Sequence, residues 1–146
     1  MALDSSVIPA VAAALFLAFL MARALNPGPG TIRWAWLVPA SLSLLFAAFS
    51  VIVILNEGPL GFWTEHVRGG WGNQIWIDLL LAIGIGWYLL VPPAQELGMR
   101  PLPWLAAVVL SGCIGLLAML ARYLYLRERA AGLDAVRVAV QAADPG

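Results

Sequence analysis

The chain has 146 residues, of which 62% are hydrophobic and 11% are charged, and its mean hydropathy is +0.90. A soluble domain is nearer half apolar and a quarter charged, and a core of this size cannot hide so much apolar surface. Eight arginines, with no lysine, balance eight acidic residues, so no basic field would attract nucleic acid. The composition therefore predicts a membrane protein and excludes a soluble enzyme, a disordered chain and a nucleic-acid-binding protein.

Four apolar stretches are long enough to cross a bilayer, whose core is about 30 Å thick and needs about 20 residues of helix. They are separated by chain breakers or charges and followed by a polar tail from Arg127: Val7 to Leu25, Trp34 to Leu55, Ile75 to Pro93 and Pro103 to Leu126. The first stretch is longer than the apolar part of a signal peptide and lacks a basic flank, so we expect it to be retained. These features predict an all-α fold, in which residues 1–146 form one membrane domain, a four-helix transmembrane bundle.

Arginines predict the orientation of this bundle. With four crossings, both termini and the 56–74 loop share one membrane face, called face A, and the two short loops lie on face B. Face A carries more arginines (Arg68, Arg127, Arg129 and Arg137, with Arg122 at its edge) than face B (Arg23, Arg33 and Arg100). By the positive-inside rule, we expect cytoplasmic termini.

Small residues recur at helical spacing in the last two predicted spans. Such faces let helices approach closely in lipid, where the hydrophobic effect does not hold them together. One face comprises Asp78, Ala82 and Gly86, and the other comprises Ser111, Gly115, Ala118 and Arg122. Because a short loop joins these two spans, we expect them to pack antiparallel through these faces.

Asp78 and Arg122 lie at matching depths in this arrangement, each about 5–6 Å below face A. We therefore expect them to face one another, since an unpaired charge at that depth is costly. Two interpretations remain open. The pair is either an ion pair that sets the register of the hairpin or part of a polar pocket that opens on face A.

Further polar residues are predicted on face A: Glu57, His66, Asn73 and Tyr123. His66 is either an exposed surface residue or a proton carrier, and without a second histidine or cysteine nearby it makes a poor metal site. The chain contains no P-loop, HExxH, GxSxG or dinucleotide-binding motif. The sequence therefore predicts no catalytic residue and no metal site.

Residues Asn73 to Arg129 resemble an uncharacterised bacterial family of small multi-span membrane proteins. The resemblance rests on Asn73 with Asp78, on Glu96 followed by Leu97-Gly98-Met99-Arg100, on Gly115, and on Tyr125-Leu126-Arg127-Glu128. It implies a compact helical membrane protein and supplies no activity. We expect the chain to be a multi-pass protein of the bacterial cytoplasmic membrane.

Three functions are compatible with this pattern. The first is a non-catalytic accessory or assembly subunit that packs on other membrane proteins and contacts lipid or pigment. The expected partners are membrane lipid and other membrane protein subunits or further copies of the chain itself. The second is an enzyme or binding protein for a membrane-dissolved isoprenoid, carotenoid or quinone, which would predict a cavity below Trp63 and Trp71. The third is a small oligomeric transporter. A bound lipid, carotenoid or quinone is the cofactor class that these hypotheses allow.

Overall fold

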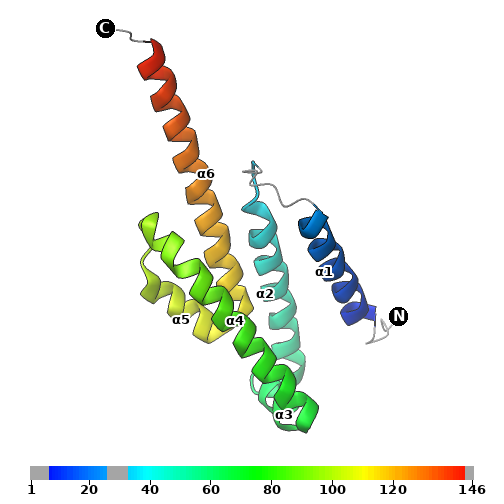
Figure 1. Ribbon diagram of the computed structural model, residues 1–146. Helices are drawn as coiled ribbons and strands as arrows, with labels where there is room; N and C mark the ends of the chain where they lie inside the picture. Colours follow the sequence, from blue (N-terminus) through cyan, green and yellow to red (C-terminus); the bar gives the residue numbers. More distant parts are fainter. Residues whose placement is uncertain (1–6, 26–32, 144–146) are drawn as a thin grey trace. The chain divides into compact units, whose positions relative to one another are not determined.

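The computed structural model describes residues 7–25 and 33–143, and every regular element in these ranges is helical (Figure 1). Contacts divide the chain into two compact units, Met1–Thr31 and Ile32–Gly146. The first unit contains helix α1 (Val7–Leu25), whose bounds match the first predicted span, and whose side chains are exposed wherever they are described.

The second unit begins with α2 (Leu37–Glu57), which follows a turn over residues 33–36. Pro39 lies in the first turn of α2, where a missing backbone N–H does least harm. The helix ends at Gly58, whose φ of 85° is a conformation that glycine adopts readily, and whose N–H donates to the Ile54 carbonyl at 2.8 Å.

The predicted 56–74 loop is partly helical. It contains α3 (Gly61–Val67) and the first residues of α4 (Gly70–Glu96), a helix of 27 residues. Gly72 allows α3 and α4 to meet closely, because a Cβ atom there would lie 2.5 Å from the Glu65 carbonyl oxygen. Both α2 and α4 are long and apolar enough to cross a membrane, and they are the two described helices that meet this criterion.

The predicted fourth span, residues 103–126, is not one helix. It is divided between α5 (Pro101–Ser111) and α6 (Cys113–Ala143), and the chain reverses at Gly112, whose φ is 58°. Figure 1 shows α5 folding back from the end of α4 and α6 reversing direction again. α6 continues through most of the predicted polar tail.

The reversal at Gly112 makes α5 and α6 an antiparallel hairpin. A Cβ atom at Gly115 would lie 2.6 Å from the Ala107 carbonyl group and 2.7 Å from the Val108 nitrogen, so the two backbones touch. The tip of the hairpin reaches the middle of α4, because a Cβ atom at Gly112 would lie 3.5 Å from Cδ1 of Ile83, the central residue of that helix. α5 has 11 residues and spans about 16 Å, about half of a bilayer core.

Contacts of α6 show the direction of the remaining helices. α2 runs antiparallel to α6, since Trp36 contacts Tyr125 while Ser43 contacts Ile114. α4 runs in the same direction as α6, because Gly86 faces Leu116 and residues later in both helices meet in the core. The core consists of Leu90 and Ala94 of α4, Met119 of α6, and Met99 from the turn after α4. We call the end of this unit that contains α3 the α3 end. The opposite end, which contains residues 33–36, 97–100 and 122–129, is called the turn end.

Candidate functional site

The predicted contact between Asp78 and Arg122 is wrong. α6 begins at Cys113, beside the middle of α4, and runs toward the turn end, whereas Asp78 lies in the half of α4 nearer the α3 end. The Arg122 guanidinium lies over the Tyr125 ring instead, 5.7 Å from its centroid. The prediction failed because it treated residues 103–126 as a continuous helix, which would have carried Arg122 to the α3 end.

Asp78 is exposed on α4. The side chains described within residues 7–25 and 33–143 form one ion pair, between Arg68 and Glu65 at 2.7 Å. Both side chains are largely exposed. Arg68 and Glu65 are three residues apart in α3 and its C-cap, so this pair stabilises that short helix locally. Asp78 therefore has no cationic partner among the described residues.

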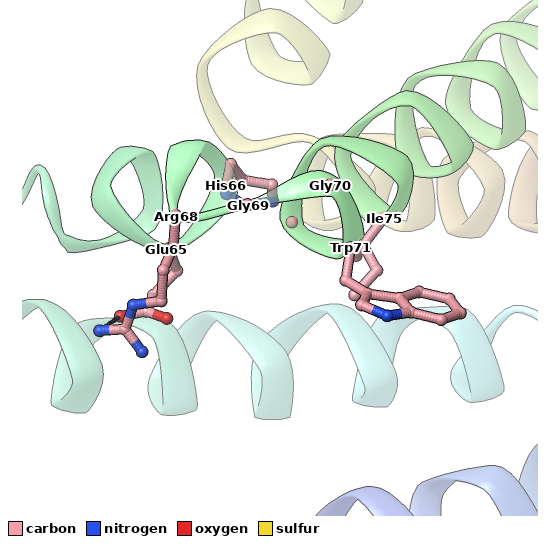
Figure 2. A pocket seen from close by; sticks show the side chains of 8 residues that line it. Glu65, His66, Arg68, Gly69, Gly70, Trp71 and Ile75 are labelled. Atoms are coloured by element: carbon pink, nitrogen blue, oxygen red, sulfur yellow. Dashed lines mark ion pairs between the residues drawn. The ribbon is translucent and has the colours of Figure 1, made fainter.

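The α3 end carries a hollow at the corner between α3 and α4 (Figure 2). Figure 2 shows the side chains of Glu65 and Arg68 extending from the α3 side and those of Trp71 and Ile75 extending from α4. The hollow is open, has a volume of about 450 Å³ and is lined by Glu65, His66, Arg68, Gly69, Gly70, Trp71, Gly72 and Ile75. The expected cavity below Trp63 and Trp71 corresponds to it in part, since Trp71 lines this hollow and Trp63 does not.

His66 is half-buried in this corner. Its Nδ1 atom is hydrogen-bonded to the Phe62 carbonyl, and because a carbonyl only accepts, Nδ1 carries the proton in this bond. The ring meets Trp76 edge to face, with 4.6 Å between the ring centroids. His66 thus packs α3 against α4, while its Nε2 atom is the ring nitrogen left for any ligand.

The other predicted polar residues lie at different places. Glu57 is exposed at the end of α2, and Asn73 is exposed in the first turn of α4, where its backbone N–H donates to the Gly69 carbonyl. Tyr123 belongs to the turn end and packs against the core of Leu90, Ala94, Met99 and Met119. The structure therefore places Glu57, His66 and Asn73 at the α3 end and separates Tyr123 and Arg122 from them.

The residues predicted to pack between helices differ in their burial and contacts. Gly86 faces Leu116, and Gly115 faces the backbone of α5. Ala118 is half-buried, whereas Ala82 and Ser111 are exposed, so the expected close contact at these last two positions is wrong. Ser111 instead donates its hydroxyl to the Ala107 carbonyl of its own helix at 2.7 Å.

A second hollow lies at the turn end, and the sequence did not predict it. It combines two arginines with three aromatic rings and a carboxylate: Arg33, Trp34, Trp36, Tyr125, Glu128 and Arg129. The sequence shows two basic and aromatic segments beside apolar runs, one at residues 33–36 and the other at residues 125–129. The sequence does not show that these two segments lie close together, because this depends on α6 passing beside the start of α2.

Comparisons with family models, with curated proteins and with solved structures find no match to this chain. The resemblance of residues 73–129 to a bacterial membrane family therefore stays a prediction. Among the residues that the structure describes, no group of three His, Cys, Asp or Glu side chains could hold a metal ion.

Proposed function

We propose that the chain is a non-catalytic integral membrane protein that acts as an accessory or assembly subunit of a membrane complex. The observation that carries the proposal is Asp78, an exposed carboxylate on an apolar helix of membrane-spanning length.

Exposed apolar side chains support membrane placement. α2 and α4 are strongly apolar, and few of the residues in their apolar segments are buried by the rest of the protein. The core helix of a soluble protein would be largely covered, whereas lipid can cover such helices without any protein contact. We propose α1, α2 and α4 as full crossings and the α5–α6 hairpin as a segment that enters and leaves at the turn end.

This topology changes the orientation predicted for a four-helix transmembrane bundle. The described arginines of the second unit lie mainly at the turn end (Arg33, Arg100, Arg122, Arg127 and Arg129), and Arg68 lies at the α3 end. By the positive-inside rule the turn end faces the cytoplasm of a bacterial cell, together with the C-terminal part of α6. The α3 end then faces the opposite side.

Asp78 supports the need for a partner. With Ile83, the centre of α4, taken as the level of the bilayer midplane, Asp78 lies five residues before it and so about 8 Å away, within a hydrocarbon half-thickness of about 15 Å. Charged side chains at such depths face other proteins or water-filled cavities and pair with polar groups. A neighbouring subunit that offers a donor to Asp78 would satisfy this requirement.

Native mass spectrometry of the chain, extracted gently from its own membranes, tests the proposal. We expect a larger complex of fixed composition, which Asp78→Asn weakens by removing the charge that the partner recognises. Glu57→Gln is the matched control, because it neutralises an exposed carboxylate at the end of α2. Extraction of the chain alone or as a homo-oligomer, or equal behaviour of the two variants, would contradict the accessory role.

A second candidate function is binding of a membrane-dissolved isoprenoid, carotenoid or quinone. It is favoured by the hollow at the α3–α4 corner, where Trp71 supplies an aromatic wall and His66 supplies one free ring nitrogen. The same spectra would then show a stoichiometric ligand, and Trp71→Ala would lose it while Trp63→Ala, outside the hollow, would keep it.

A further inference from the structure

We propose that the hollow at the turn end binds the phosphate group of an anionic phospholipid. The hollow has a volume of about 270 Å³ and is lined by Arg33, Trp34, Trp36, Tyr125, Glu128 and Arg129. This inference rests on the membrane placement proposed above, because only then does the hollow lie at the depth of lipid headgroups.

Aromatic rings form one wall of this site. Trp36 meets Tyr125 edge to face with 5.5 Å between centroids, and Trp34 lies 6.3 Å from Trp36. The Arg129 guanidinium lies over the same Tyr125 ring at 5.3 Å, and that of Arg122 lies at 5.7 Å. Arginines stacked on a ring are held in place while their N–H groups stay free for an anion.

The charges of the site favour an anion. The one carboxylate that lines the hollow, that of Glu128, accepts the backbone N–H of Trp34, with donor–acceptor distances of 3.1 and 3.3 Å to its two oxygens. Arg33 and Arg129, which also line the hollow, form no ion pair with any carboxylate in the part of the chain that the structure describes. Guanidinium groups bind phosphate oxygens through paired N–H donors, which makes phosphate the expected ligand class.

The turn that carries Arg33 and Trp34 has a fixed backbone conformation at Trp34. Its φ of 67° is a left-handed conformation that a bulky residue rarely adopts. The hydrogen bond to Glu128 and the bond from the Leu37 N–H to the Trp34 carbonyl, at 2.9 Å, oppose relaxation of this turn. The bond to Glu128 joins this turn to α6, so that Arg33 and Arg129, which are 96 positions apart in sequence, line the same hollow.

The surroundings favour a lipid over a free phosphate. Tryptophan and tyrosine prefer the boundary between the hydrocarbon layer and water, where phospholipid phosphates lie. Immediately after Trp36 in sequence, α2 exposes the apolar side chains of Leu37 and Val38, along which acyl chains can extend. An anionic lipid would thus use the arginines and the apolar helix surface together, whereas inorganic phosphate would use the arginines alone.

The test measures retention of phosphatidylglycerol and phosphatidylcholine by the full chain in native mass spectrometry. The wild type is expected to retain phosphatidylglycerol selectively, and Arg33→Gln with Arg129→Gln is expected to weaken it about tenfold or more, since hydrogen bonds to charged groups are among the stronger ones. The matched control, Arg100→Gln with Arg127→Gln, removes the same charge from the turn end outside the hollow. It is expected to change retention less than about threefold, because neither Arg100 nor Arg127 lines the hollow and exposed charges outside it contribute little.

Arg33→Lys with Arg129→Lys guards against a folding defect, because it keeps the charge and removes the paired donors. We expect an intermediate loss of phosphatidylglycerol. Retention equal to wild type in the lysine variant, or equal losses in the glutamine and control variants, would show diffuse attraction and overturn the site. Binding of inorganic phosphate by the wild type, without selective retention of phosphatidylglycerol, would overturn the assignment to a lipid.

The two proposals fail in different ways. A chain that alkaline carbonate releases from membranes would refute the membrane placement itself. A chain that stays in the membrane but shows no preference between the two lipids would refute the headgroup site alone.

Discussion

At the scale of single residues, Ser43 joins two helices that are far apart in sequence. It is the buried polar residue among those described, and its hydroxyl donates to the Ile114 carbonyl at 3.0 Å. Ile114 lies in the first turn of α6, close to the tip of the hairpin, and the buried Ser43 hydroxyl has little access to water that could replace a lost hydrogen bond. The bond therefore stabilises the tip against α2.

Ser43→Ala is expected to lower the free energy of unfolding by about 1 kcal/mol, the usual contribution of one such hydrogen bond. Unfolding in detergent micelles, followed by circular dichroism, measures the change. Ser41→Ala is the control, because Ser41 is exposed on the same helix and its replacement should cost less than about 0.5 kcal/mol. Equal effects of the two changes would show that the bond to Ile114 does not stabilise the fold.

At the scale of elements, the α5–α6 hairpin depends on glycine at two positions. Gly112 supplies the positive φ of the reversal, and Gly115 lets the backbones of α5 and α6 touch. Neither glycine was recognised as a turn signal in the sequence. Both lie in a run of apolar residues, where a helix can continue through glycine at a cost of about 1 kcal/mol.

Gly115→Ala is expected to destabilise the protein by about 2 kcal/mol or more, because the new methyl group meets the Ala107 and Val108 backbone rather than a flexible side chain. Gly84→Ala is the control, since a Cβ atom there meets nothing within 4 Å. It should stabilise α4 by about 0.5 kcal/mol, the gain from replacing a helical glycine. Thermal unfolding of both variants compares them. A tolerated alanine at Gly115 would contradict the close contact.

At the scale of the whole molecule, the proposed topology predicts that the hairpin returns α6 to the side of the membrane on which α4 ends. Single cysteines in a Cys113→Ala background, labelled from one side of sealed vesicles, test this. We expect Gln95→Cys at the turn end and Leu133→Cys in α6 to react from the same side, and Thr64→Cys in α3 from the other. If Leu133→Cys reacts together with Thr64→Cys, residues 103–126 cross the membrane as one helix and the proposed topology is wrong.

The sequence by itself determined the all-helical class and the approximate bounds of α1, α2 and α4. These follow from local features, namely long apolar runs and the chain breakers between them, because backbone hydrogen bonds within a helix involve only near neighbours. The sequence also indicated that polar residues gather around residues 56–74. It predicted a pair between Asp78 and Arg122 that depended on one assumption, the continuity of the last span.

Only the tertiary structure decided that this span folds back at Gly112. The reversal is stabilised by contacts with residues distant in sequence, including Ser43 and Ile83, which no local pattern reveals. As a result, Arg122 lies beside Tyr125 at the turn end, Asp78 is left exposed on α4, and Arg33 and Arg129 line one hollow. The positive φ of Gly112 thus changes which charged residues lie close together, because it reverses the chain and so sets the direction of α6 and the position of every residue in it.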